Sequence, residues 1–140
     1  MATPAAPAPG FRRIGSFDVV AGAERVARFR AALALGGAGG AGRGEVPVTF
    51  PICWLAEPAV KSALLVALGG GGKVPVHLDQ EMEYFAPLRI GQPYAMDVGL
   101  AGPDARGVAR VRADLRDGAG ARVASVCGSF VLAGGKEPRP

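Results

Sequence analysis

The chain has 140 residues, which suits one domain with one continuous core. Its apolar share of 49% and charged share of 20% are ordinary for a globular domain, and its formal net charge is +4. No block of basic residues resembles a nucleic-acid arm, and no apolar stretch is long enough to span a bilayer, so we expect neither nucleic acid nor membrane as partner. Cys53 and Cys127 are too few for a disulfide framework and lack metal-ligand spacing, which predicts a reducing cytoplasm and no metal.

The first third of the chain predicts a tail, a short strand and a helix. Residues 1–10 are rich in alanine and proline without the pattern of a secretory signal, so we expect a disordered tail. Residues 11–20 are expected to be extended. Apolar side chains then recur at helical spacing over 23–35, and the glycine-rich residues 36–44 end that helix in a loop.

A second helix is expected at the centre of the fold. Pro58 suits a first helical turn, where its missing N–H is harmless. The following residues, Ala59 to Leu68, are apolar on nearly every side, relieved only by Lys61 and Ser62. A helix with almost no polar face must be covered by protein, which predicts a surrounding sheet.

Residues 74–88 alternate in the way of a half-buried strand. The even positions are mostly apolar and the odd positions are mostly charged. This alternation places His77 and Asp79 together on the face opposite Leu78 and Met82.

Three further strands are predicted at 94–100, 109–116 and 122–132, separated by turns rich in Gly, Pro and Asp. Together with the helices they predict an α+β domain over residues 11–133, and residues 134–140 read as a second loose tail. An antiparallel meander wrapped around a central apolar helix is the hot-dog arrangement.

The segment from Val76 to Tyr94 resembles the MaoC-like dehydratases, and most of all their amino-terminal, non-catalytic hot-dog module. The segment Val46 to Pro51 is similar to that module's approach to the central helix. The resemblance spans about residues 11–132, and within the first segment it rests on His77, Gln80, Glu83, Tyr84, Pro87 and Gly91.

This resemblance implies paired hot-dog folds with a tunnel for an acyl group carried on coenzyme A or acyl carrier protein. The family hydrates 2-enoyl thioesters reversibly and uses an Asp/His pair for proton transfer, with no cofactor. The catalytic modules have a GD-x-N-P-x-H pattern after the first helix, whereas residues 36–50 here contain no Asp, Asn or His. We therefore expect the non-catalytic partner of a hydratase or dehydratase, or a diverged member, and whether the chain is itself an enzyme stays open.

His77 and Asp79 are weak catalytic candidates, because His77 is the only histidine and Asp79 is expected beside it. A surface or interface histidine explains the same pattern. Gln80 and Tyr84 interrupt the apolar face of their strand and are candidates for substrate contact, with structural hydrogen bonding as the alternative. Trp54 is a further candidate ligand contact, or a core residue.

Arg110 and Arg112, with Arg116, line one side of a strand. They are candidate contacts for coenzyme A phosphates or an acidic carrier protein, or else a solvated face.

Two other functions stay open. A thioesterase would use a carboxylate at the start of the central helix, where Glu57 is the candidate. An acyl-binding or assembly subunit would have no turnover. The expected partner is a second copy or a catalytic hot-dog chain, and a homodimer is the simplest case.

Overall fold

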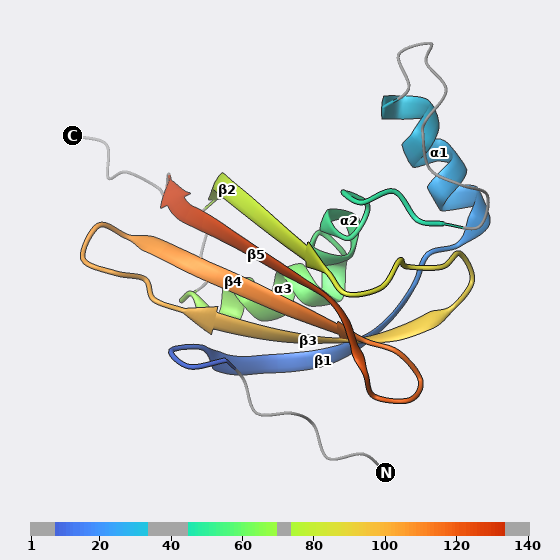
Figure 1. Cartoon of the computed structure of the whole chain (residues 1–140). Helices are drawn as coiled ribbons and strands as arrows, with labels where there is room; N and C mark the ends of the chain where they lie inside the picture. The colour runs from blue at the N-terminus through green and yellow to red at the C-terminus, as the bar shows by residue number, and fades with distance from the viewer. Residues whose placement is uncertain (1–7, 34–44, 70–73, 134–140) are drawn as a thin grey trace.

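A computed structural model describes residues 8–33, 45–69 and 74–133. In it the two later helices lie on one face of a five-stranded antiparallel sheet, and the first helix lies beyond one end of that sheet (Figure 1). The predicted tails, apart from residues 8–10, and the glycine-rich residues 36–44 lie outside these ranges. The predicted α+β arrangement is confirmed. The elements in chain order are β1 (Arg12–Val20), α1 (Ala23–Leu33), α2 (Ile52–Leu55), α3 (Pro58–Ala67), β2 (Val74–Tyr84), β3 (Pro93–Ala101), β4 (Val108–Arg116) and β5 (Arg122–Ala133).

The strand order is β1-β3-β4-β5-β2, so only β3, β4 and β5 form a meander. The expectation that β2 continues directly into that meander is wrong, because β2 pairs with β5 at the far edge. Residues 85–92 connect β2 to β3 across the width of two intervening strands. Three strand spacings amount to roughly 15 Å, which eight residues span with ease.

Leu88 anchors this connection in the core. Its side chain is 1% exposed, and its carbonyl oxygen accepts a hydrogen bond from the N–H of Val46 at 2.9 Å. The next residue, Arg89, donates its N–H to the hydroxyl of Tyr94 at 2.8 Å. Burial and hydrogen bonding therefore fix the path of the connection without regular secondary structure.

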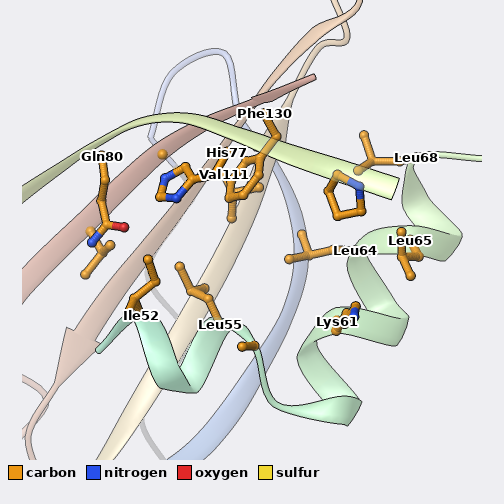
Figure 2. Close-up of a pocket in the computed structure, with 14 residues that line it drawn as sticks. Ile52, Leu55, Lys61, Leu64, Leu65, Leu68, His77, Gln80, Val111 and Phe130 are labelled. Atoms are coloured by element: carbon orange, nitrogen blue, oxygen red, sulfur yellow. The ribbon is translucent and has the colours of Figure 1, made fainter. Parts of the chain in front are cut away.

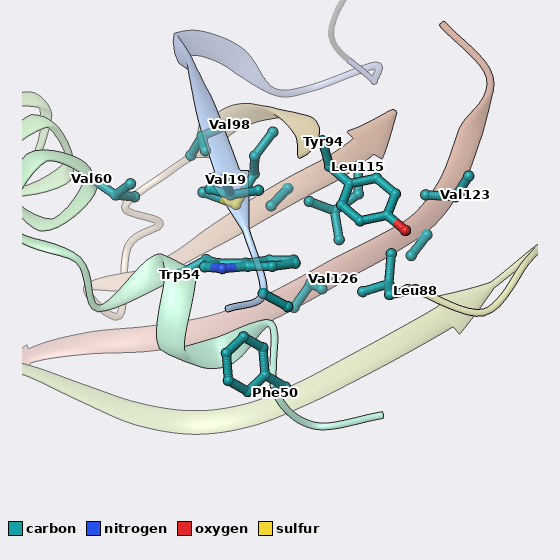
Figure 3. Packing of buried hydrophobic residues seen from close by; sticks show 14 of the residues in the cluster. Val19, Phe50, Trp54, Val60, Leu88, Tyr94, Val98, Leu115, Val123 and Val126 are labelled. Atoms are coloured by element: carbon teal, nitrogen blue, oxygen red, sulfur yellow. The ribbon is translucent and has the colours of Figure 1, made fainter. Parts of the chain in front are cut away.

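Aromatic side chains join the helices to the inner face of the sheet (Figure 3). Trp54 of α2 and Phe50 just before it are completely buried, and their rings meet edge to face with centroids 5.6 Å apart. Phe29 of α1 meets Phe50 on its other side at 5.3 Å, and Tyr94 of β3 lies 6.4 Å from Trp54. The sequence pattern did not predict the short helix α2. Burial of its Trp54 side chain in the aromatic cluster stabilises it.

The central helix α3 occupies nearly the predicted residues, but the sheet of one chain covers only one of its sides. Val60 is buried, whereas Val66 is 78% exposed. The predicted sheet wrapped around a central apolar helix is confirmed, and within the described ranges it covers one side of that helix and leaves Val66 exposed. No helix in the described ranges is long and apolar enough to cross a membrane.

Replacing Trp54 with alanine should lower the free energy of unfolding by about 3–5 kcal/mol, because it removes the centre of the aromatic cluster and leaves a cavity. Urea denaturation followed by circular dichroism measures this change. The matched control is Val48→Ala, since Val48 is 65% exposed and should change stability by less than about 0.5 kcal/mol. Equal effects at the two positions would contradict the core described above.

Candidate functional site

A cavity of about 200 Å³ lies between the helices and the sheet, next to edge strand β2 (Figure 2). Its lining is overwhelmingly apolar. The helical wall comes from α2, α3 and the residues that end them: Ile52, Leu55, Ala56, Lys61, Leu64, Leu65 and Leu68.

The opposite wall comes from three neighbouring strands, β2, β5 and β4. Two polar side chains belong to it, both on β2, and a glycine lies in the middle of β5. The full set is Pro75, His77, Gln80, Val111, Val126, Gly128 and Phe130. Among the lining residues Ala56, Lys61 and His77 are exposed, so the cavity opens between α3 and the edge strand β2.

His77 lies on the cavity side of β2, so the expectation that it faces away from the core is wrong. The register between β2 and β5 shifts between His77 and Asp79, which leaves Leu78 as an extra residue. Such a bulge reverses the facing of all residues before it. His77 therefore shares the cavity face with Gln80, while Leu78 is 54% exposed and Asp79 is not part of the lining. The predicted His77–Asp79 pair does not form.

The imidazole of His77 stacks on the ring of Phe130 from β5. Their centroids are 4.8 Å apart and the planes differ by 13°. Gly128 lies beneath both rings: a Cβ there would come within 3.2 Å of His77 Nε2 and 3.3 Å of Phe130 Cε2. A glycine inside a strand often marks such a close approach. A side chain at this position would require both rings to shift by a few tenths of an ångström.

Gln80 and His77 are the polar groups on the sheet side of the cavity. Within the described residues, no hydrogen bond to the side chain of either one is present. Lys61 adds one positive charge on the helical wall and is exposed. The described lining contains no carboxylate, and the described part of the chain holds no cluster of three or more His, Cys, Asp or Glu side chains suited to a metal.

Glu57, the candidate thioesterase carboxylate, is not part of the cavity lining. It lies at the N-cap of α3 and forms an ion pair of 2.6 Å with Arg25 of α1. Arg25 also donates to the carbonyl oxygen of Cys53 at 3.2 Å. The geometry of Glu57 is that of a residue joining α1 to the start of α3.

Trp54 and Tyr84 also lie outside the lining. Trp54 is fully buried in the aromatic cluster, with Nε1 3.4 Å from the carbonyl oxygen of Val20. The hydroxyl of Tyr84 donates to the carbonyl oxygen of Val48, which connects β2 to the loop before α2. Burial raises the pKa of Tyr84 from 10.0 to about 12, because the phenolate would lose its solvation.

Arg110 and Arg112 lie on the sheet face opposite the cavity. Arg112 pairs with Asp114 at 3.2 Å, and the guanidinium of Arg110 lies near Cys127 Sγ (3.2 Å) and over the ring of Phe11 (5.7 Å). Alternation along β4 turns Val111 and Ala113 to the core, so it turns both arginines outward. The structure does not bring them together with His77 and Gln80.

Of the fourteen lining residues, only His77 and Gln80 were candidate site residues in the sequence analysis. Those that it missed include Lys61, Leu64, Gly128 and Phe130. The usable signal was Gly128, since a glycine within the predicted last strand marks a place where other groups approach the backbone. Lys61 stands out in the sequence only as a polar interruption of an apolar helix. Its place beside a cavity follows from the packing of α3 and not from its own neighbours in sequence.

Comparison with known proteins gives the fold. No family model and no curated protein matches the sequence. The (R)-hydratase from A. caviae involved in PHA biosynthesis superposes with a TM-score of 0.61 at 17% identity, over 92% of this chain and 100% of that one. The HadBC (3R-hydroxyacyl-ACP dehydratase) complex from Mycobacterium tuberculosis gives 0.66 at 15% identity, over 82% and 90%.

A thioesterase from Thermus thermophilus, complexed with coenzyme A and Zn, gives a TM-score of 0.59 at 16% identity, over 94% of this chain and 87% of that one. Dehydratase and thioesterase structures thus resemble the chain about equally. The predicted hot-dog fold is confirmed, and the likeness does not extend to a choice of activity.

The raised pKa of Tyr84 predicts how stability responds to alkali. Between about pH 10 and about pH 12 the unfolded chain loses the tyrosine proton and the folded chain keeps it. The contribution of Tyr84 is therefore complete below about pH 10 and is lost as the pH rises through about 12.

Tyr84→Phe tests this directly in urea denaturation series. At neutral pH the variant should be less stable by roughly 0.5–1.5 kcal/mol, the usual cost of one hydrogen bond. That difference should shrink above about pH 10. A difference that stays constant across this range would show that the hydroxyl is not protected by the fold.

Proposed function

We propose that this chain binds the acyl part of an acyl thioester, carried on coenzyme A or acyl carrier protein, in the cavity between α3 and β2. The observation that carries the proposal is the lining, which is apolar apart from Lys61, His77 and Gln80. Apolar walls with few polar groups suit a hydrocarbon chain that ends in a carbonyl. Lys61, exposed beside the opening, suits the phosphates of the carrier.

Within that function, the chain is the non-catalytic partner or a diverged member of the hydratase and dehydratase class. Hydration of a 2-enoyl thioester needs one group to activate water and one to protonate carbon. The described lining offers one histidine and no carboxylate, and Asp79 lies off the cavity face. The absence of Asp, Asn and His from residues 36–50 points the same way. This composition supports binding without turnover.

The edge strand β2 supports pairing with a second hot-dog chain. Its outer side chains include three large apolar residues that are 43–60% exposed, namely Val74, Val76 and Leu78. An exposed apolar edge strand invites another strand, and closed two-fold pairing is the common solution. Pairing here would also cover the opening of the cavity. A homodimer is the simplest form, and a catalytic hot-dog chain is the alternative mate. The cytoplasm stays the predicted location.

Binding and turnover can be separated with the purified chain. Affinity for hexanoyl-CoA is measured by calorimetry, and crotonyl-CoA hydration and acyl-CoA hydrolysis are assayed alongside. We expect binding with no turnover above background. Leu64→Trp, which fills the cavity, should weaken binding roughly tenfold, equivalent to about 1.4 kcal/mol. The control is Val48→Trp, on an exposed side chain that is not part of the lining.

Other results of this experiment would identify the other functions. Hydration above background would make the chain an enzyme of the hydratase class. Hydrolysis that Glu57→Gln abolishes would make it a thioesterase despite the ion pair with Arg25. Equal affinity in the two tryptophan variants would place acyl binding elsewhere and so contradict the proposal.

Leu78→Lys tests the paired assembly. A charge on an edge strand opposes strand addition, so the variant should elute as a monomer where the wild type elutes as a dimer in size-exclusion chromatography with light scattering. Val48→Lys places the same charge on another exposed apolar residue and should leave the dimer intact. A monomeric wild type, or a dimeric Leu78→Lys variant, would contradict an interface at β2.

A further inference from the structure

The bulge at Leu78 gives the cavity a hydrogen-bonding group in a fixed position. Pro75, His77 and Gln80 follow one another along the cavity side of β2, so His77 is the middle one of the three (Figure 2). Its ring cannot turn freely, because Phe130 covers one face with a 13° stack. A ring held by packing presents its nitrogens in one geometry, and this lowers the entropic cost of binding.

Phe130 and Gly128 together set where the imidazole lies. The ring stacks on Phe130, and its Nε2 lies next to the backbone of Gly128, 3.2 Å from the position that a Cβ would have there. His77 and Gln80 are the polar side chains of the sheet-side wall, so the imidazole borders the space that a molecule bound in the cavity would occupy.

We propose that His77 donates a hydrogen bond to the carbonyl oxygen of the bound acyl thioester. Phe130 fixes the ring, and the small size of Gly128 lets the ring lie against the sheet beside the cavity. His77 has no hydrogen-bond partner within residues 8–33, 45–69 and 74–133, so the bond to a ligand replaces water and no protein contact. The inference rests on the proposed function, and it makes His77 a residue that selects thioesters, with no proton transferred.

A pair of ligands that differ only in the carbonyl isolates this contact. Hexanoyl-CoA has the thioester carbonyl, whereas S-hexyl-CoA has a methylene in its place. Wild-type protein should bind the thioester roughly 3- to 10-fold more tightly, the range of one net hydrogen bond. His77→Phe preserves an aromatic stack on Phe130 and removes the donor. This variant should bind both ligands with the affinity that the wild type has for S-hexyl-CoA.

Two glycine variants test the position of the imidazole. Gly128→Ala should lower the preference for the thioester, since its Cβ would come within 3.2 Å of His77 Nε2 and 3.3 Å of Phe130 Cε2 and would shift both rings. Gly118→Ala is the matched control, because a Cβ there meets nothing within 4 Å. Circular dichroism and unfolding of each variant establish that it folds. Phe130→Leu, which removes the stack and keeps an apolar side chain, should lower the preference without removing it.

The possible results distinguish the two proposals. If wild-type protein binds neither ligand, the proposed function fails and the inference fails with it. If it binds both with equal affinity, the acyl site stands and the contact with His77 is wrong. A preference that His77→Phe leaves unchanged also overturns the contact. Loss of the preference in His77→Phe and a lowered preference in Gly128→Ala, with retention in Gly118→Ala, support it.

Discussion

The contact between the aromatic cluster and the inner face of the sheet determines where every functional group lies. Trp54 and Phe50 are fully buried, and Trp54 holds the short helix α2 against Tyr94 of β3. Because α3 begins three residues after α2 ends, its position follows from that anchor. The cavity is the space that remains between α3 and the sheet once the larger aromatic side chains have filled the other end. Its apolar character is a consequence of the core, of which it is an extension.

Local sequence patterns predicted the helices and strands better than they predicted which strands pair with one another. Pro58 and the apolar run after it predicted α3 almost to the residue, and alternation predicted the four strands of the second half. The pairing of β2 with β5 was missed because alternation says which face a residue takes and nothing about which strand lies beside it. The decisive error in the site came from one residue. Leu78 resembles an ordinary apolar position in an alternating strand, yet as a bulge it reverses the facing of His77. No propensity of Leu78 signals that, since tertiary pairing decides where the extra residue is placed.

Charged side chains lie on the outer face of the sheet, and apolar side chains lie on its inner face. On the outer face Asp97 contacts Arg13 and Arg116, and Asp114 contacts Arg112 and Arg122. These carboxylates lie between strands and away from the cavity, where they pair with arginines across β1, β3, β4 and β5. A cavity whose described lining has no carboxylate, and whose charged residue Lys61 is exposed, is well suited to burying a chain of methylene groups, each worth about 0.8 kcal/mol when removed from water. Removing a proton from water needs a base that a second group orients. The distribution of charge is therefore one of the observations that support the proposed binding of an acyl chain.

The edge strand β2 belongs both to the wall of the cavity and to the proposed interface with a second chain. β2 contributes His77 and Gln80 to the cavity with one face, and it presents Val76 and Leu78 to solvent with the other. The bulge at Leu78 explains why His77 faces the cavity and Val76 faces solvent, because it reverses the facing of the residues before it, whereas Gln80 follows the bulge and keeps the facing that alternation predicts. A partner strand added along β2 would cover the apolar side chains and would at the same time limit access to His77 from the open side. A ligand in the cavity and a partner strand at the edge would both contact β2. Both would exclude water from this strand, so each should stabilise the other. In such an arrangement one strand would contribute both to the proposed ligand site and to the proposed contact with a partner chain.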